Sequence, residues 1–100
     1  MEIYRGSTPT HLLDLEYPLR FITDIRITYE QNDRPIIIKK IEDCKKHKGL
    51  LAYKLTQEET YRLIEGKGVI NIRAKTLRGN VIPTEKIRFN VIGTGSKEVI

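Results

Sequence analysis

Alternating apolar and polar side chains, repeated along most of this 100-residue chain, constrain its fold more than any other feature. Residues 24–30 show the pattern most clearly, because Ile25, Ile27 and Tyr29 are separated by polar or charged residues. Successive side chains of a β-strand point to opposite faces of a sheet, so a period of two indicates strands with one buried face. The same alternation occurs in four further segments, residues 11–17, 50–55, 69–77 and 81–92. The sequence therefore predicts a mainly β domain.

Turn-forming residues separate these segments, as in residues 31–35 and 78–80. Six or seven short antiparallel strands joined by turns are typical of an immunoglobulin-like β-sandwich, which is the predicted fold, and a small β-barrel is the alternative. The chain has no Trp and a single Cys, which argues against an antibody-type domain. Pro83 predicts an edge position or a bulge in the last strand. The first segment predicts an inward face made of Leu13, Leu15 and Tyr17.

One segment departs from the strand pattern and predicts a short helix. Thr56 is followed three residues later by Glu59, which is the spacing of a capping box at a helix N-terminus. The helix is expected over residues 57–65, with Gly66 ending it, and it would cross between the two sheets. Its buried face would be formed either by Tyr61 and Ile64 or by Thr60, Leu63 and Ile64.

The chain is expected to form a single β-sandwich domain over residues 1–92, followed by a flexible C-terminal tail at 93–100. The longest apolar run is Ile36–Ile38, far shorter than the ~20 residues that cross a bilayer. The N-terminal residues lack the apolar stretch of a secretory signal, and a single cysteine fits a reducing compartment. We therefore expect no membrane partner and synthesis in the cytoplasm.

No arrangement of residues in the sequence predicts catalysis. The two histidines, His11 and His47, lie in different segments, and neither accompanies a recognised nucleophile motif. Cys44 stands beside Lys45 and Lys46, which would lower the pKa of its thiol, but an incidental loop cysteine is the preferred interpretation. We expect a non-enzymatic protein without a metal or a cofactor.

Basic residues give the chain a formal net charge of +5 and fall into two sets. One set occupies a presumed loop and the other the outer face of the last two strands; together they are the candidate contact residues Lys39, Lys40, Lys45, Lys46, Lys48, Arg73, Lys75, Lys86 and Arg88. A hairpin at residues 79–80 would bring Arg73 close to Lys86, and like charges opposite each other are destabilising. Such a surface suits an acidic protein or the phosphates of a nucleic acid. The aromatic residues that proteins binding single strands use for stacking fall mostly at inward positions, which favours a merely solvated basic face or a contact with an acidic protein over nucleic acid.

Several short elements resemble small prophage-encoded proteins of Gram-positive bacteria. They are the opening Ile3–Thr10 (IYRGSTPT), the stretch Leu55–Thr60 (LTQEET), a following glycine and the strand Ile70–Arg73 (INIR). The resemblance spans about residues 3–92 in the same order. It implies an immunoglobulin-like structural or accessory protein of a phage, in the tail, the baseplate or at the head–tail connection. It implies no catalytic residue.

The resemblance and the residue pattern together predict a structural or assembly protein that acts through protein–protein contacts. Its expected partners are other phage structural proteins or further copies of the chain, and its expected locations are the bacterial cytoplasm during synthesis and the virion. The alternative hypothesis is an accessory protein that binds nucleic acid through the basic loop and the basic strand face.

Overall fold

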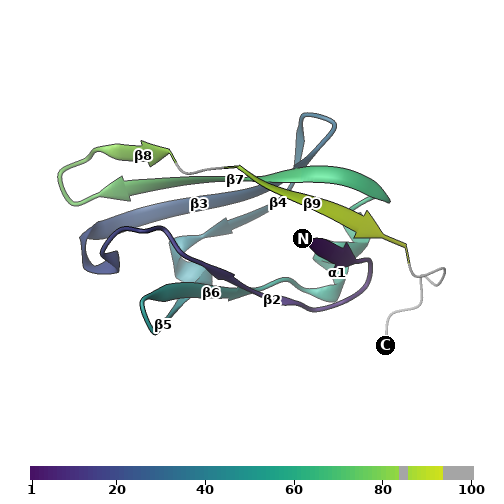
Figure 1. Ribbon diagram of the computed structural model, residues 1–100, viewed down its shortest axis with the longest axis horizontal. Coiled ribbons are helices and arrows are strands. Elements are labelled where there is room, and N and C mark those ends of the chain that lie inside the picture. The colour runs from purple at the N-terminus through teal and green to yellow at the C-terminus, as the bar shows by residue number, and fades with distance from the viewer. Residues whose placement is uncertain (84–85, 94–100) are drawn as a thin grey trace.

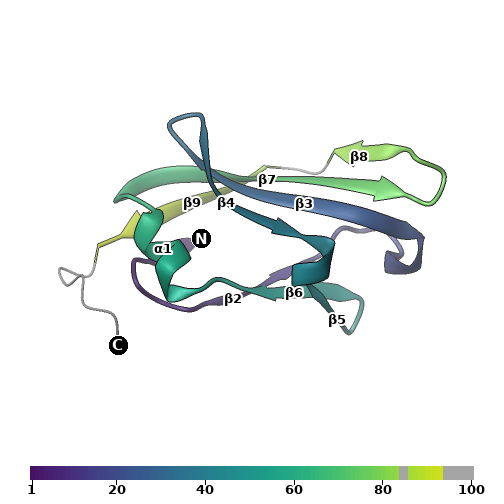
Figure 2. The same cartoon turned by 180° about the vertical axis from the view of Figure 1, so that it is seen from behind.

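Two β-sheets face each other in the computed structural model, which describes residues 1–83 and 86–93 (Figures 1 and 2). The larger sheet has six strands and the smaller one three. The strands are β1 (Glu2–Tyr4), β2 (Thr10–Leu13), β3 (Ile22–Gln31), β4 (Arg34–Lys40), β5 (Lys45–His47), β6 (Leu50–Lys54), β7 (Gly66–Thr76), β8 (Val81–Pro83) and β9 (Ile87–Ile92). A short helix, α1 (Gln57–Arg62), links β6 of the smaller sheet to β7 of the larger one.

The order of the strands is that of an immunoglobulin-like sandwich. The larger sheet runs β1-β9-β7-β3-β4, with β8 also paired to β7, and the smaller sheet runs β2-β6-β5. All pairs are antiparallel except β1 with β9, which is parallel. The last strands of the chain thus lie beside β3 in one sheet while β2 and β6 pair in the other, as in immunoglobulin domains. The predicted fold class is confirmed, and the barrel alternative is wrong because the two sheets remain separate.

The described part of the chain has nine strands, more than the six or seven expected. β1 and β5 contain only three residues each, too few for an alternation to be recognised. The predicted last strand is divided into β8, which ends at Pro83, and β9, which begins at Ile87. Residues 39–48, whose pattern fits a loop or a frayed continuation of the strand predicted at 35–40, are more ordered than expected. β4 ends at Lys40, and a 3-10 turn at Ile41–Asp43 and then β5 follow it. The predicted tail lies outside the described residues from 94 onward.

The core lies between the sheets and is built by the inward half of the alternation. Ile25, Ile27 and Tyr29 of β3 are almost completely buried, as predicted. The other strands contribute their alternate residues in the same way: Leu51 and Tyr53 of β6, Ile70, Ile72 and Ala74 of β7, and Phe89 and Val91 of β9. Tyr17 is the exception, because β2 ends at Leu13 and the chain has already left the sheet there; its side chain is 39% exposed.

Helix α1 begins as predicted but ends three residues early. The Thr56 side chain accepts a hydrogen bond from the Glu59 amide (3.1 Å), and the Glu59 carboxylate accepts one from the Thr56 amide (2.8 Å). The helix stops at Arg62 because Leu63 has extended backbone, with ψ at 143°. Thr60 and Leu63 are therefore buried, but the expectation for Ile64 is wrong, since its side chain is 54% exposed. Within the described residues, no helix has the length and hydropathy needed to span a membrane.

Close packing between β7 and β9 depends on the absence of a side chain at Gly68. Gly68 lies opposite Phe89, whose ring fills the space that a side chain would occupy. A methyl group at Gly68 would overlap this ring and lie 2.7 Å from the backbone oxygen of Glu30. Since a backbone oxygen of a central strand cannot move aside easily, β7 tolerates only glycine here.

We predict that Gly68→Ala destabilises the fold by about 1–3 kcal/mol, the usual range for overpacking a well-filled core. The measurement is the free energy of unfolding in urea. Lys67→Ala is the matched control, because Lys67 is the exposed neighbour on the same strand and such changes usually lie within ±0.5 kcal/mol. Equal stabilities of the two variants would contradict this account of the β7–β9 contact.

Candidate functional site

Three cations lie side by side on the outer face of the larger sheet. Arg26 of β3 pairs in register with Arg73 of β7 on one side and with Lys40 of β4 on the other. All three residues are exposed. Neighbouring strands are about 4.8 Å apart, so the three backbone positions span roughly 10 Å. We refer to Arg73, Arg26 and Lys40 as the basic row.

The basic row lacks internal neutralisation. Among the described residues, no carboxylate forms an ion pair with any of its three side chains. The nearest carboxylate in the register is Asp24, which lies opposite Lys75 in the adjacent row of the sheet. Like charges directly opposite each other on a sheet are destabilising, so this arrangement costs folding free energy unless an anion binds to it.

A shallow depression of about 240 Å³ lies at the basic row. Arg26, Arg73, Lys75 and Asp24 line it, together with Val81 of β8. Cations thus outnumber the single carboxylate around this depression. It therefore suits an anionic ligand.

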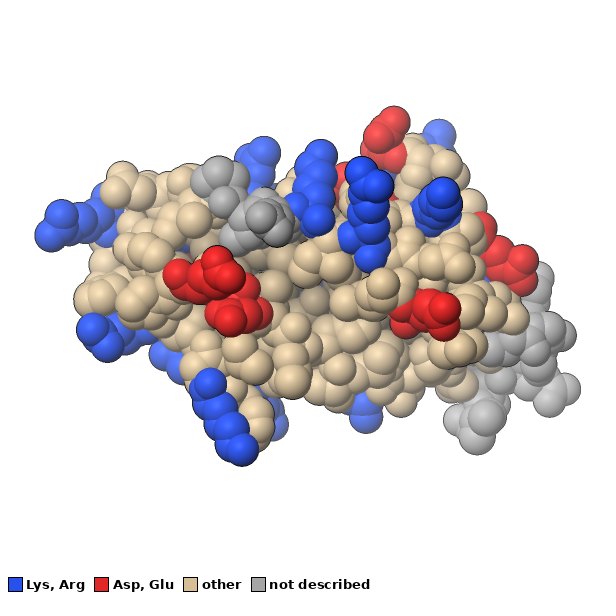
Figure 3. All heavy atoms as spheres, viewed as in Figure 1, with Lys and Arg blue, Asp and Glu red and all other residues tan. Residues whose placement is uncertain are grey.

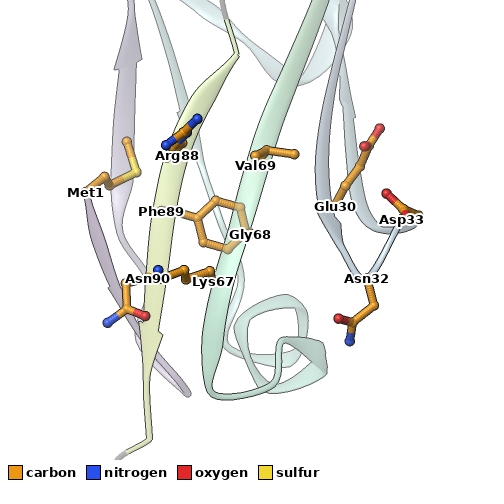
Figure 4. Close-up of a pocket in the computed structure, with 10 residues that line it drawn as sticks. All are labelled: Met1, Glu30, Asn32, Asp33, Lys67, Gly68, Val69, Arg88, Phe89 and Asn90. Atoms are coloured by element: carbon orange, nitrogen blue, oxygen red, sulfur yellow. The ribbon is translucent and has the colours of Figure 1, made fainter.

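A larger depression of about 540 Å³ lies further along the same sheet, toward the β3–β4 turn (Figure 4). Lys67 and Arg88 line it from β7 and β9, while Glu30 and Asp33 line it from the β3 side. Because cations and carboxylates face each other across it, this depression carries little net charge. It is a weaker candidate for an anion than the basic row.

Lys and Arg side chains project from both the upper and the lower side of the molecule in the view of Figure 3. The nine predicted contact residues divide between the two sheets. Arg73, Lys75 and Arg88 are exposed on the larger sheet as predicted, Lys86 is exposed just before β9, and Lys40 joins them through β4. The remaining exposed lysines, Lys45, Lys46 and Lys48, lie in or beside β5 of the smaller sheet. The presumed basic loop is therefore not one surface.

Lys39 is a correction to the predicted contact set. Lys39 is two residues from the buried Ile37, so both side chains lie on the inward face of β4, where Lys39 is 9% exposed. Its ammonium nitrogen lies 2.7 Å from the Glu59 carboxylate of α1. Burial acts to raise the pKa of Glu59, but Lys39 and the hydrogen bonds from Thr56 hold this pKa below its usual value. Lys39 therefore joins β4 to α1 and does not belong to an exposed surface.

The predicted Arg73–Lys86 juxtaposition is also wrong, because the register partner of Arg73 on that side is Pro83. The cation that does lie beside Arg73 is Arg26, which the sequence-based contact set omits. Alternation alone places Arg26 on the outer face of its strand. Recognising it as part of a site requires the pairing of β3 with β7 and β4, and residue patterns do not specify that pairing.

Apolar side chains are exposed where the larger sheet extends past the smaller one. The β7–β8 hairpin and the beginning of β3 project beyond β5 and β6 (Figures 1 and 2). Four large apolar residues are exposed at this end, Tyr17, Phe21, Leu77 and Val81, and we refer to them as the apolar end. A depression of about 360 Å³ is lined by three of them, Tyr17, Phe21 and Leu77, together with Arg78. Large exposed apolar groups that gather in one place are typical of interaction sites.

A buried polar network joins the two sheets. His11 and Tyr53 are cross-strand neighbours on β2 and β6, and Tyr29 reaches them from β3. The Tyr29 hydroxyl lies 2.7 Å from the Tyr53 hydroxyl and is hydrogen-bonded to Nδ1 of His11. Burial raises the pKa of both tyrosines, that of Tyr53 to about 12, and lowers the pKa of His11. All three groups are therefore neutral near pH 7, and their hydrogen bonds compensate for the loss of solvent.

Cys44 is less reactive than its neighbouring lysines suggest. Burial and the Asp43 carboxylate raise the pKa of its thiol, and Lys39 only partly opposes them. The thiol lies 3.4 Å from the Lys40 carbonyl, to which it donates a weak hydrogen bond. The expected lowering of this pKa is wrong. In residues 1–83 and 86–93, His, Cys, Asp and Glu side chains form no group of three that could hold a metal ion.

Comparisons with known proteins add little to this geometry. No family model and no curated protein matches the chain. Among solved structures, the crystal structure of CopC from Methylosinus trichosporium OB3b aligns with a TM-score of 0.45 and 14% identity, over 78% of this chain and 72% of that chain. The immunoglobulin-like assignment therefore rests on the strand order of this chain, and the prophage origin stays a prediction.

We predict that the folded protein loses stability as the pH falls below the ordinary histidine pKa of 6.5. Burial lowers the pKa of His11, so the unfolded chain binds a proton more readily than the folded one. The stability contributed by neutral His11 is thus fully present above pH 6.5 and is lost as the pH falls through the folded pKa. The measurement is the urea midpoint between about pH 5 and pH 8.

The other histidine provides the control. His11→Gln should flatten the pH dependence of the urea midpoint over this range, whereas His47→Gln, at an exposed position of β5, should preserve it. A profile that is equally steep in wild type and in His11→Gln would show that the network does not carry the effect.

Proposed function

We propose that this chain is a non-enzymatic assembly protein of phage or prophage origin that binds another protein through its apolar end. The observation that supports this proposal most directly is the exposure of Leu77 (64%) in one depression with the two partly exposed rings of Tyr17 and Phe21. Apolar and aromatic side chains supply most of the binding free energy at the centres of protein interfaces. The resemblance to prophage-encoded proteins supports the origin and the class of partner.

The apolar end is held in a defined shape, which favours binding. The Leu77 amide donates a hydrogen bond to the Phe21 carbonyl (2.9 Å), so the hairpin that carries Leu77 is fastened to the 3-10 turn that carries Phe21. The rings of Tyr17 and Phe21 contact each other edge to face, with centroids 6.5 Å apart. A surface that is already ordered loses little conformational entropy when a partner covers it.

Cations at the rim indicate the chemistry of the partner. The guanidinium of Arg20 lies over the Phe21 ring, 4.7 Å from its centroid, and Arg78 lines the neighbouring depression. A partner with an apolar centre and acidic residues around it would complement both features. We therefore propose a second phage structural protein with such a patch, in the tail, the baseplate or at the head–tail connection.

We predict that Leu77→Asn weakens binding to that partner at least 10-fold, because truncating the central apolar contacts of an interface typically costs more than about 1 kcal/mol. The chain is co-expressed with the products of the reading frames that flank its gene, and complexes are identified by size exclusion with light scattering. Calorimetry then compares the variant with wild type. Since Leu77 is mostly exposed, the substitution should leave the stability of the fold almost unchanged.

Leu12→Asn is the matched control, because Leu12 is 57% exposed but belongs to β2 of the smaller sheet. It should leave the affinity unchanged. Equal losses for the two variants would contradict the assignment to the apolar end. A chain that stays monomeric and binds none of the flanking products would overturn the proposed function, whereas self-association lost in Leu77→Asn would identify a second copy as the partner.

A further inference from the structure

We infer that the outer face of the larger sheet binds the phosphate backbone of double-stranded DNA, with Arg26 and Arg73 as its central contacts. This inference does not depend on the proposed function, because it concerns a different surface. It starts from the basic row, in which three adjacent cations occupy one line across β7, β3 and β4. A guanidinium is the side chain best suited to phosphate oxygens, since it can donate two parallel hydrogen bonds.

The basic row is arranged for an external anion. Arg26 lies between two cations and has no ion-pair partner among the described residues. Within the described part of the chain, the depression beside it is lined by the cations Arg26, Arg73 and Lys75 and by one carboxylate, that of Asp24. A phosphate at this position would relieve the repulsion within the row and would contact at least two guanidinium groups.

The extent of the charge indicates a polymer rather than a small anion. Arg73, Arg26 and Lys40 continue across β7, β3 and β4 over roughly 10 Å, and Lys75 adds an outward cation next to Arg73 on β7. Lys67 and Arg88 do not belong to this set, because Glu30 and Asp33 face them across their own depression. A single phosphate reaches only one part of the basic row. A nucleic-acid backbone, which carries a charge at every nucleotide, can follow all of it.

The neighbours of the basic row favour a duplex over a single strand. The next row of the sheet consists of Asn71, Thr28 and Ile38, so no aromatic ring lies beside the cations on that side. Proteins that bind single strands use such rings to stack the bases. A row of cations with no stacking residue in the adjacent row suits the regular phosphates of a duplex, and it offers little that could read a sequence.

The test measures binding of a fluorescein-labelled DNA duplex by anisotropy at about 50 mM and 200 mM salt. Wild type should bind at low salt and lose most of its affinity at the higher concentration, because the release of counterions from the DNA becomes less favourable as the salt concentration rises. Arg26→Thr and Arg73→Thr should each weaken binding several-fold and reduce the salt slope by about one. Lys46→Thr is the matched control: it removes an exposed cation from β5 of the smaller sheet and should leave binding unchanged.

Thermal unfolding of the same variants gives an independent readout. Removing one member of the basic row relieves repulsion, so Arg26→Thr should raise the melting temperature at low salt while it weakens DNA binding. The increase should shrink at high salt, where the charges are screened. A merely structural role for Arg26 would give the opposite sign, a lower melting temperature accompanied by weaker binding.

Three outcomes would overturn the inference. The first is no DNA binding at low salt, and the second is an equal loss of affinity in Lys46→Thr and in Arg26→Thr. The third is binding of a polyglutamate peptide as tight as that of the duplex, since this would assign the face to an acidic protein. None of these three outcomes bears on the binding of a protein at the apolar end. The DNA-binding inference and the proposed function can therefore be rejected independently of each other.

Discussion

The contact of Tyr29 with the opposite sheet is the interaction on which the rest of the structure depends. Its side chain is completely buried, and its hydroxyl bonds to His11 and Tyr53, which belong to two strands of the smaller sheet. Its ring also packs on Phe89 of β9, with centroids 5.7 Å apart. One residue thus joins two strands of the larger sheet, β3 and β9, to two strands of the smaller sheet, β2 and β6. Removing its hydroxyl would leave polar groups in the core without partners, which costs far more than the hydrogen bonds contribute on balance.

The position of Tyr29 also determines what the outer surface presents. Because side chains alternate from Ile25 to Gln31 along β3, an inward Tyr29 requires inward Ile27 and Ile25, and it requires Arg26 to point outward. A shift of one residue in the pairing would bury a guanidinium and expose the core. The basic row is therefore a consequence of core packing on β3, combined with the register of β4 and β7. Packing of the buried face therefore compensates for the repulsion between the like charges of the basic row.

The sequence predicts those features that depend on one strand at a time. The inward residues of β3, β6 and β7 follow from alternation, and the start of α1 follows from the spacing of Thr56 and Glu59. The helix end was not predictable in the same way. Gln31 donates a hydrogen bond to the Ile64 carbonyl and accepts one from its amide, so a residue distant in sequence binds the backbone directly after the extended Leu63.

Features that depend on two strands were missed for the same physical reason. Lys39 resembles any other lysine of a basic segment until β4 is placed beside α1, where its partner Glu59 compensates for burial. Arg26 resembles any outward residue until β7 and β4 are placed on either side of it. A charge becomes a structural link or a binding group only through its neighbours across strands, and nothing within a single strand encodes those neighbours. Candidate sites on a sheet are for this reason harder to predict from sequence than the sheet itself.

The two surfaces can act together because the sandwich is elongated. The described elements extend along an axis of 46 Å, with the apolar end where the larger sheet projects and the basic row on its outer face. A protein that covers Leu77 and Phe21 approaches along the long axis, whereas a duplex lies across β7, β3 and β4. The nearest point of competition is Val81, which is exposed at the apolar end and also lines the depression at the basic row. Coupling between the two ligands would therefore act through the β7–β8 hairpin, because β7 contributes Thr76 to the depression at the apolar end and Arg73 to the basic row, while Val81 lies on β8.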